Sequence, residues 1–332
     1  MKQILISLAA LSLVAACQKS PVEEVPSAEP QTTIVTFLLE DAELSRATSS
    51  SAESTIEKAQ VAVYNASGTL LAVASAVNGA ATLRVPIGES GCSAFALANS
   101  ANDLASYGTR SAVLNLQSTL GANRAASLSG LEMSGSLTGI TFTENYTATI
   151  SLVRFAAKVE IDEIVNAIPG NPKLTINGIY LINVSTRMRY DYSVSAYNWA
   201  QKRAYTASES SITPYTADIF SVEVNGGASY STPHYFYCYP NGTTTDSSAP
   251  TWSARFTRLV VEASYSGNDY YYPVNIRGAD GKLNYNTSYA ITRLTITGPG
   301  SDSPDKPVNK GAAIFNLSVI PWETGVSQEV EI

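Results

Sequence analysis

The chain has 332 residues, of which 45% are hydrophobic and 15% are charged. This content excludes a disordered chain, and the length predicts two domains at roughly 150 residues each. The net charge of −7 gives no broad basic surface for phosphates, so we expect no nucleic acid partner. His234 is the single histidine, which leaves little basis for metal sites or for Ser/Cys–His catalysis. We therefore expect a β-rich binding or building protein that is not an enzyme and needs no metal and no cofactor.

Residues 1–16 predict a signal peptide. Lys2 precedes an apolar run over residues 4–16, which is too short to span a membrane as a helix. The stretch Val14-Ala15-Ala16-Cys17 resembles the lipobox of bacterial lipoproteins, in which the cysteine becomes the lipidated first residue. An ordinary signal peptide with an incidental cysteine is the alternative. Residues 18–30 are rich in Pro and Glu and predict a flexible tether after Cys17.

Alternating apolar and polar residues, interrupted by Gly, Asn, Ser and Pro, predict β-strands in the first half of the chain. We expect these strands over residues 33–39, 59–64, 69–73, 81–85, 93–98 and 147–164. Residues 65–68, Asn-Ala-Ser-Gly, predict a hairpin turn. Val113, Leu116 and Leu120 recur at helical spacing, so a short helix is expected between residues 103 and 120.

The second half repeats this pattern after residues 168–172, Ile-Pro-Gly-Asn-Pro, which cannot continue a central strand and predict a domain boundary. Strands are expected over residues 174–182, 235–239, 259–263, 271–276, 289–297, 313–320 and 326–332, with an elaborated loop over 190–215. Many short strands with little helix predict an all-β fold. We expect two tandem β-sandwiches, over residues 47–168 and 169–310.

These motifs, in this order, resemble the fimbrillin family of the Bacteroidales, the FimA/Mfa-type subunits of type V pili. The resemblance spans nearly the whole chain and implies that both sandwiches are transthyretin-like. It does not fix whether the subunit belongs to the stalk, the anchor or the tip. After the lipobox and tether, the resemblance is carried by Ile56-Glu57-Lys58-Ala59-Gln60-Val61-Ala62-Val63-Tyr64 with Gly68, Arg154 with Ala157-Lys158-Val159, Tyr237 with Pro240-Asn241, Tyr272-Pro273-Val274-Asn275-Ile276, Asn286 with Tyr289, and Gly298, Gly300, Ser301 and Pro304 before a last strand ending at Trp322.

The resemblance implies an outer-membrane lipoprotein precursor that enters a cell-surface pilus, or fimbrium, after processing. Signal peptidase and the lipidation machinery would act at Cys17, and an Arg-specific surface protease would cut after Arg46, which leaves Ala47 as the new N-terminus. The sequence supports the second cut, because Arg46 lies in a polar loop with a serine-rich exit. The alternative is that Arg46 is a solvated loop residue. Cleavage would remove residues 17–46, the lipidated tether and the first strand.

The strand that cleavage would remove is rich in large apolar residues, and those assigned to its packing are Ile34, Val35, Phe37 and Leu39. Its loss would expose unpaired backbone groups and an apolar floor, which a strand from a neighbouring subunit could cover. Residues 1–46, the signal peptide together with the segment removed, carry three basic and six acidic residues, so the mature subunit would have a net charge of −4. Such a mild charge is compatible with stacking of identical copies.

The resemblance further implies polymerisation with other pilin subunits by donor-strand exchange. The candidate donor is the C-terminal appendage, residues 311–332. Its apolar residues are Ile314, Leu317, Val319, Val326, Val330 and Ile332. These residues could instead form the last strands of their own domain, and the sequence does not decide which C-terminal strand is the donor. Head-to-tail contacts of this kind build open filaments.

Tyrosine is unevenly distributed, since 15 of the 19 tyrosines lie beyond residue 189. A structural use on strands is favoured over a contact surface for host or bacterial ligands. The candidate ligand-contact aromatics are Tyr190, Tyr192, Tyr197, Trp199 and Tyr205.

Two cysteines remain beyond the signal segment, Cys92 and Cys238. They could pair in an oxidising compartment, but they lie in different expected domains, so buried strand positions are favoured. Taken together, the sequence predicts a structural subunit of an adhesive surface pilus. The alternative is a monomeric surface lipoprotein that binds glycans and keeps its anchor at Cys17.

Overall fold

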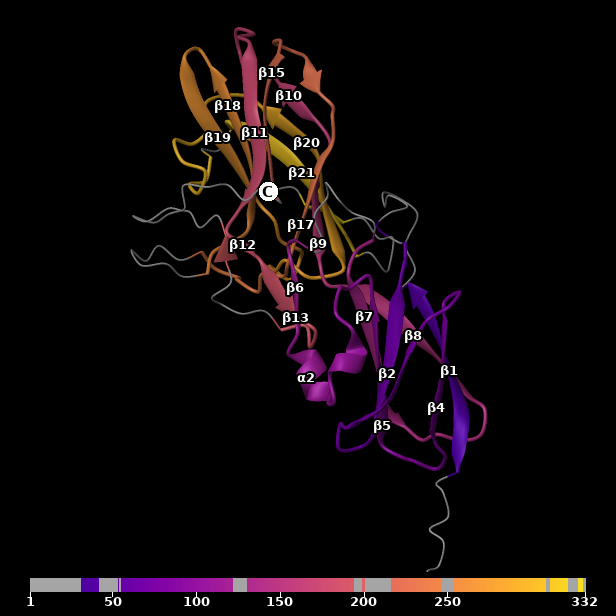
Figure 1. Ribbon diagram of the computed structural model, residues 1–332. Coiled ribbons are helices and arrows are strands. Elements are labelled where there is room, and N and C mark those ends of the chain that lie inside the picture. The colour runs from indigo at the N-terminus through magenta and orange to yellow at the C-terminus, as the bar shows by residue number, and fades with distance from the viewer. Residues whose placement is uncertain are drawn as a thin grey trace, which may run out of the picture. The chain divides into compact units, whose positions relative to one another are not determined.

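The computed structural model describes the chain from residue 31 onward, with gaps (Figure 1). The described residues are 31–41, 53, 55–121, 130–193, 199–200, 216–246, 254–308, 311–321 and 328–330, without the side chains of residues 41, 315–318, 320, 321 and 328–330. Nearly every described element is a strand, and the helical elements with described bounds are η1 (Leu104–Ser106) and α2 (Arg110–Leu114). The all-β fold class predicted from the sequence is confirmed.

The first sheet has seven strands in the order β3-β2-β5-β7-β8-β1-β4. Their bounds are β1 (Thr32–Asp41), β2 (Ala59–Tyr64), β3 (Leu70–Ser75), β4 (Ala80–Pro86), β5 (Cys92–Ala98), β7 (Met133–Ile140) and β8 (Tyr146–Arg154). The outermost strands, β3 and β4, are joined by a tight turn at Asn78 and Gly79, whose φ angles of 51° and 76° fit a type I′ hairpin. The sheet therefore folds back on itself around an apolar core that includes Phe37, Val61 and Leu83.

Two further sheets are built from the rest of the chain. The larger contains β9 (Ala157–Ile161), β10 (Ile164–Asn166), β16 (Ser229–Tyr230), β17 (His234–Cys238), β20 (Thr287–Ile296), β21 (Ala313–Pro321) and β22 (Gln328–Val330). The smaller has the order β15 (Ala217–Val224), β11 (Leu174–Ile182), β18 (Arg258–Tyr265) and β19 (Asn268–Asn275). Ile176 of β11 and Ile291 of β20 belong to one buried cluster, so the two sheets share a core.

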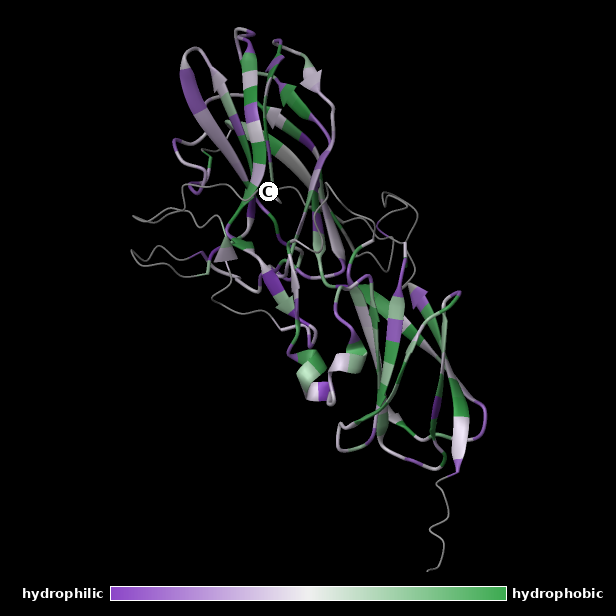
Figure 2. Cartoon of the chain, viewed as in Figure 1, coloured by the Kyte–Doolittle hydropathy of each residue, from purple (hydrophilic) through white to green (hydrophobic). Residues whose placement is uncertain are grey.

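Short strand pairs complete the fold. β12 (Val184–Ser185) pairs with β14 (Trp199–Ala200), and β13 (Arg187–Arg189) pairs with β6 (Gln117–Thr119). Hydrophobic and hydrophilic residues alternate in bands along strands such as β2 and β11 (Figure 2). This alternation is the pattern from which the strands were predicted, and β2 and β11 have the predicted bounds.

The single strand expected over residues 147–164 is wrong, because this stretch forms three strands. β8 pairs with β1 and β7, whereas β9 pairs with β17 and β20, and β10 pairs with β16 and β20. Asn286 holds the chain where it passes from β8 to β9. Its side chain accepts from the Arg154 N–H at 3.2 Å, and its own N–H donates to the Ala156 carbonyl at 2.9 Å. The chain thus changes sheets before residues 168–172, and the two-domain boundary at that point stays a prediction.

Strands β2 and β5 are buried on both faces. Val61 and Val63 face the first core, while Ala62 and Tyr64 join the cluster shared by the other two sheets. The hairpin turn predicted over residues 65–68 is confirmed, with Gly68 at a φ of 81°. The predicted helix is shorter than expected, because α2 ends at Leu114 and Leu120 lies beyond β6.

Both cysteines of the described chain are buried and unpaired, Cys92 on β5 and Cys238 on β17, as the sequence predicts. Burial raises the pKa of the Cys238 thiol to about 12, so the thiol stays neutral. Across the described residues, no helix has the length and apolar character needed to cross a membrane.

Candidate functional site

Strand β1 lies inside the first sheet and not at its edge. It pairs antiparallel with β4 from Thr32 to Leu38 and parallel with β8 from Val35 to Asp41. Both of its backbone edges therefore take part in ladders. Taking β1 out would separate β4 from β8 and leave a row of unpaired N–H and C=O groups on each of them.

The side chains of β1 alternate strictly between core and solvent. Val35 and Phe37 are fully buried and Leu39 is 8% exposed, whereas Ile34 is 48% exposed. Of the four apolar residues predicted for the removable strand, three therefore fill the core and Ile34 does not. Thr33 is the fourth inward residue, at 7% exposure, and sequence reasoning missed it although it lies two residues before Val35.

The floor beneath β1 is aromatic as well as aliphatic. The Phe37 ring lies 6.1 Å from the Tyr146 ring, and Tyr146 meets Phe142 edge-on with ring centroids 5.6 Å apart. The Thr33 hydroxyl accepts from the Asn145 N–H at 3.2 Å, which fixes the start of the strand. The site of β1 is thus a row of apolar pockets with one polar end.

The segment after β1 is held at Glu53, which is 1% exposed. Its Oε1 accepts from the Tyr237 hydroxyl at 2.6 Å and lies 3.2 Å from the Lys158 Nζ. Its carbonyl oxygen accepts from the Arg154 Nε at 3.1 Å. Three motif residues on which the family resemblance depends, Arg154, Lys158 and Tyr237, therefore meet at Glu53. An isolated buried glutamate leaves no pattern in the sequence, so Glu53 was not predicted.

Electrostatics explain why this cluster is stable in a buried setting. Burial opposes the charge of Lys158, but Glu53 and Glu160, the latter 2.9 Å away, outweigh it and keep the pKa of Lys158 raised. Burial and the charge of Glu53 together raise the pKa of Tyr237, so its hydroxyl stays a proton donor.

The described donor residues lie on two strands, β21 and β22, which differ in how many residues pair with a neighbouring strand. β21, with Ile314, Leu317 and Val319, pairs with β20 over nine residue pairs. β22, with Val330, pairs with β21 over three. Val326 and Ile332 lie outside the described residues. Ile314 is 57% exposed and Val319 packs against the shared core, so these two residues, an odd number of positions apart, lie on opposite faces.

The chain is also fixed just before β21. Asp305 is 3% exposed, and its carboxylate lies 2.8 Å from the Arg255 guanidinium and 2.7 Å from that of Arg258. The Asn183 amide donates to the same carboxylate at 3.1 Å. Glu53 and Asp305 are therefore two buried acidic anchors, one after the predicted removable strand and one before the predicted donor.

Among the candidate ligand-contact aromatics, the prediction for Tyr190 is wrong. Tyr190 is fully buried, its ring stacks on Phe155 at 5.0 Å, and its hydroxyl donates to Glu132 at 2.6 Å. A core tyrosine with a satisfied hydroxyl cannot contact a surface ligand. Tyr192 is half-buried and stacks on Tyr285 at 4.8 Å. Trp199 is half-buried on β14, and Tyr197 and Tyr205 lie outside the described residues.

The single histidine is held by its neighbours. His234 Nδ1 lies 2.7 Å from Asp218, its Nε2 lies 2.9 Å from the Tyr230 hydroxyl, and its ring stacks on Phe220 at 4.9 Å. Both ring nitrogens are thus engaged in structural contacts. Among the residues that the structure describes, no three His, Cys, Asp or Glu side chains come together as metal ligands.

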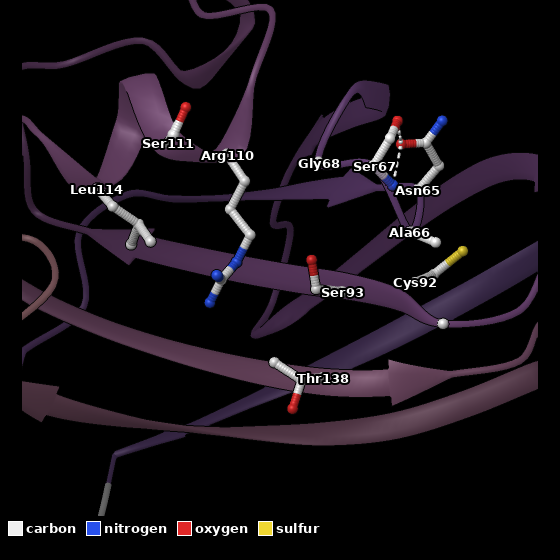
Figure 3. Close-up of a pocket in the computed structure, with 11 residues that line it drawn as sticks. Asn65, Ala66, Ser67, Gly68, Cys92, Ser93, Arg110, Ser111, Leu114 and Thr138 are labelled. Atoms are coloured by element: carbon white, nitrogen blue, oxygen red, sulfur yellow. Dashed lines mark hydrogen bonds between the residues drawn. The ribbon is translucent and has the colours of Figure 1, made fainter.

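A cavity of about 370 Å³, lined by both polar and apolar groups, opens on the first sheet. Its walls come from the turn at residues 65–68, the start of β5, Thr138 of β7, and α2. Figure 3 shows Arg110 reaching from α2 toward the strand that carries Ser93. No sequence motif predicts this cavity, because its residues come together only through the pairing of β2, β5 and β7.

The described fold has clear relatives among solved structures, although no family model and no curated protein matches the sequence. A candidate cell adhesion protein of Bacteroides eggerthii is 18% identical with a TM-score of 0.64, over 88% of this chain and 96% of that one. A fimbrilin of Porphyromonas gingivalis is 16% identical with a TM-score of 0.64, over 87% and 97%. The tip fimbrial protein Mfa3 of the same species, truncated at its C-terminus, is 14% identical with a TM-score of 0.51, over 87% and 99%. The chain therefore has the fold of the Bacteroidales fimbrilins, as the sequence resemblance predicts.

Proposed function

We propose that this chain is a structural subunit of an adhesive surface pilus. In this proposal it is exported as an outer-membrane lipoprotein, cleaved after Arg46, and polymerised by donor-strand exchange. The observation that carries the proposal is the position of β1 between β4 and β8. A strand whose removal opens the middle of a sheet makes room for a replacement, whereas removal of an edge strand would leave only a shorter sheet. The fimbrilin fold of the chain supports the same role.

The burial of β1 supplies the driving force. Val35, Phe37 and Leu39 are buried, and at roughly 2 kcal/mol for each side chain their exposure would cost about 6 kcal/mol. This free energy is comparable with the whole stability of a typical domain. A subunit that has lost β1 therefore has a strong tendency to take up another strand of matching pattern.

Arg46 is well suited to be the residue after which the protease cleaves. It is the only Lys or Arg between β1 and Glu53. Cleavage there would release β1 from the covalent chain, while Glu53 keeps the following segment attached through Arg154, Lys158 and Tyr237. The mature N-terminus would then be short and anchored close to its end.

The donor is the appendage over residues 311–332, and its strand β22 detaches from the sheet of its own subunit before β21 does. Three residue pairs hold β22, against nine for β21. Val326, Val330 and Ile332 lie an even number of residues apart, as do Val35, Phe37 and Leu39. They can therefore face one side of a strand together.

N-terminal sequencing of surface-extracted protein tests the cleavage. Wild-type chains are expected to begin at Ala47 and to form a high-mass ladder. Arg46→Lys and Arg46→Ala should both begin at lipidated Cys17 and stay monomeric, because the protease reads arginine and not charge alone. Wild-type chains that all begin at Cys17, without a ladder, would contradict the pilin proposal and favour the glycan-binding lipoprotein.

Two double variants, one on each face of the proposed donor strand, test the donor role. Val326→Asp with Val330→Asp places charges in the apolar pockets and should give folded, cleaved monomers. Ser327→Asp with Glu329→Gln changes the alternate positions and should polymerise as the wild type does. Deletion of residues 326–332 should reproduce the first result. Equal polymerisation of both double variants would refute the donor role of this segment.

A further inference from the structure

The cavity beside α2 is lined by residues that take no part in the proposed strand exchange. Its lining is mixed: hydroxyl side chains at Ser67, Ser93, Ser111 and Thr138 and one cation at Arg110 lie among apolar groups such as Leu114. None of its walls belongs to β1, β21 or β22. The cavity therefore exists whether or not the first strand is exchanged.

Arg110 is fixed at its backbone and unpartnered at its side chain. Its N–H donates to the Gly68 carbonyl at 2.9 Å, and the preceding Thr109 caps α2 by accepting from the Ala112 N–H. Within the described part of the chain, the guanidinium has no hydrogen-bond or ion-pair partner, and its Nε is buried without one. Arg110 is half-buried, and a buried N–H group without an acceptor, such as its Nε–H, is costly, so its position favours an incoming anion.

Tyr64 does not line the cavity, but it is a second unsatisfied donor that feels the charge of Arg110. The side chain is fully buried and its hydroxyl has no partner among the described residues. Burial raises the pKa of Tyr64 to about 12, partly offset by the positive charge of Arg110. The hydroxyl is therefore neutral and able to donate at physiological pH.

The neutral groups around Arg110 define what else the ligand must offer. The Ser93 hydroxyl has no partner in the described chain and lies on the strand toward which Arg110 extends (Figure 3). The Ser67 hydroxyl donates to Asn65 Oδ1 at 2.7 Å, which leaves the Asn65 amide nitrogen to donate outward. One cation surrounded by hydroxyl and amide groups matches one carboxylate surrounded by alcohols. A phosphate dianion would call for more positive charge than Arg110 supplies.

We propose that this cavity binds one acidic sugar residue, with its carboxylate on Arg110 and a ring hydroxyl on Ser93. The volume of about 370 Å³ lies at the small end of ligand pockets, which suits a single sugar ring. This site goes beyond the structural role of the subunit, because it gives the surface of the first sheet a specificity for carboxylated glycans. It does not depend on cleavage at Arg46 or on polymerisation.

Titration of the purified full-length chain with glucuronate, glucose and acetate, followed by saturation-transfer NMR, tests the proposal. Glucuronate should bind at least tenfold more tightly than either glucose, which lacks the carboxylate, or acetate, which lacks the ring. Arg110→Gln should weaken glucuronate at least tenfold. Ser93→Ala should weaken glucuronate severalfold and leave acetate unchanged.

Arg84→Gln is the matched control, because Arg84 lies on β4 in the same sheet and outside the cavity. It should bind glucuronate as the wild type does, and thermal unfolding should show that Arg110→Gln is folded. Equal binding of glucuronate and glucose, or full binding by Arg110→Gln, would overturn the proposal. Acetate binding as tightly as glucuronate would overturn the sugar part. An aspartyl peptide that binds more tightly than glucuronate would overturn it in favour of a protein carboxylate.

Discussion

Glu53 is a buried residue at which three contacts from distant parts of the chain meet. Its carboxylate pairs with Lys158 and Tyr237, and its carbonyl accepts from Arg154. We predict that Glu53→Gln lowers the free energy of unfolding by about 3 kcal/mol, because it leaves Lys158 buried with one partner fewer. Urea unfolding of the full-length precursor measures this loss.

Glu223→Gln is the control for Glu53→Gln. Glu223 pairs with Lys173 at 2.8 Å, but both side chains are more than half exposed, at 61% and 63%. Its loss should change the free energy of unfolding by no more than about 0.5 kcal/mol. Similar losses for the two variants would contradict the role of Glu53 as a buried anchor.

Asp162 gives the molecule a predictable pH dependence. Burial and the neighbouring Glu160 raise the pKa of Asp162 from 3.8 to about 6, against the opposing effect of Lys158. Because the folded-state pKa is the higher one, the favourable contribution is complete below pH 4 and is lost as the pH rises through 6. We predict that Asp162→Asn removes this loss, worth about 1 kcal/mol after solvent screening. Thermal unfolding of both proteins at pH 4, 5, 6 and 7 checks the sign; parallel curves would contradict it.

Residue-level features of the site were only partly predictable from the sequence. Val35, Phe37 and Leu39 were found because strand periodicity reveals which residues share a face. Glu53 and Arg110 were not, since a buried glutamate and an unpaired arginine acquire meaning only from residues distant in the chain. Tyr190 was placed on a surface because the sequence could not reveal Glu132 as the buried partner of its hydroxyl.

At the scale of the element, β1 shows how far one strand depends on its register. Val35 is fully buried and its neighbour Ile34 is half exposed. We predict that Val35→Asp destabilises the uncleaved precursor by about 4 kcal/mol, because a carboxylate enters an apolar core. Ile34→Asp should cost no more than about 0.5 kcal/mol. Thermal unfolding of the two variants tests which face of β1 is buried. A larger loss of stability for Ile34→Asp than for Val35→Asp would mean that the opposite face is buried.

Most strands were predictable, and the exceptions have physical causes. No Gly or Pro and no exposed residue separates β8 from β9, since Phe155 and Ala156 are both buried, so the sequence shows no sign that the chain changes sheets there. The change depends on Asn286, which lies 132 residues after Arg154. β15 was missed because its inward and outward residues differ little, with Ile219 as much as 63% exposed.

At the scale of the whole molecule, the groove proposed for the mature subunit should accept its own lost strand. A synthetic peptide of residues 32–41, added in excess to cleaved subunits, should suppress the high-mass ladder. The same peptide with Val35, Phe37 and Leu39 replaced by Ser should not, because it cannot fill the apolar pockets. Undiminished polymerisation with the native peptide would contradict strand exchange at the β1 position.

The fold class followed from composition and alternation, which act on every strand alike. The sheet order did not, because strands such as β1 and β8 are neighbours in space and distant in sequence. The all-β prediction and the fimbrilin fold agree at the level of architecture. Which strand is exchanged depends on topology, and this is where the structure adds most to the sequence.

The parallel pairing of β1 with β8 has a kinetic consequence. Thr33 and Asn145 are 112 residues apart, whereas β2, β3, β5 and β7 form antiparallel pairs that close earlier in the chain. Long-range closure is slow, so we expect β1, the first strand synthesised, to be the last to acquire protected amides during refolding. Pulsed hydrogen exchange would detect this order, and early protection of β1 would contradict it. Filament growth would then repeat between molecules the final folding step that each precursor completes alone.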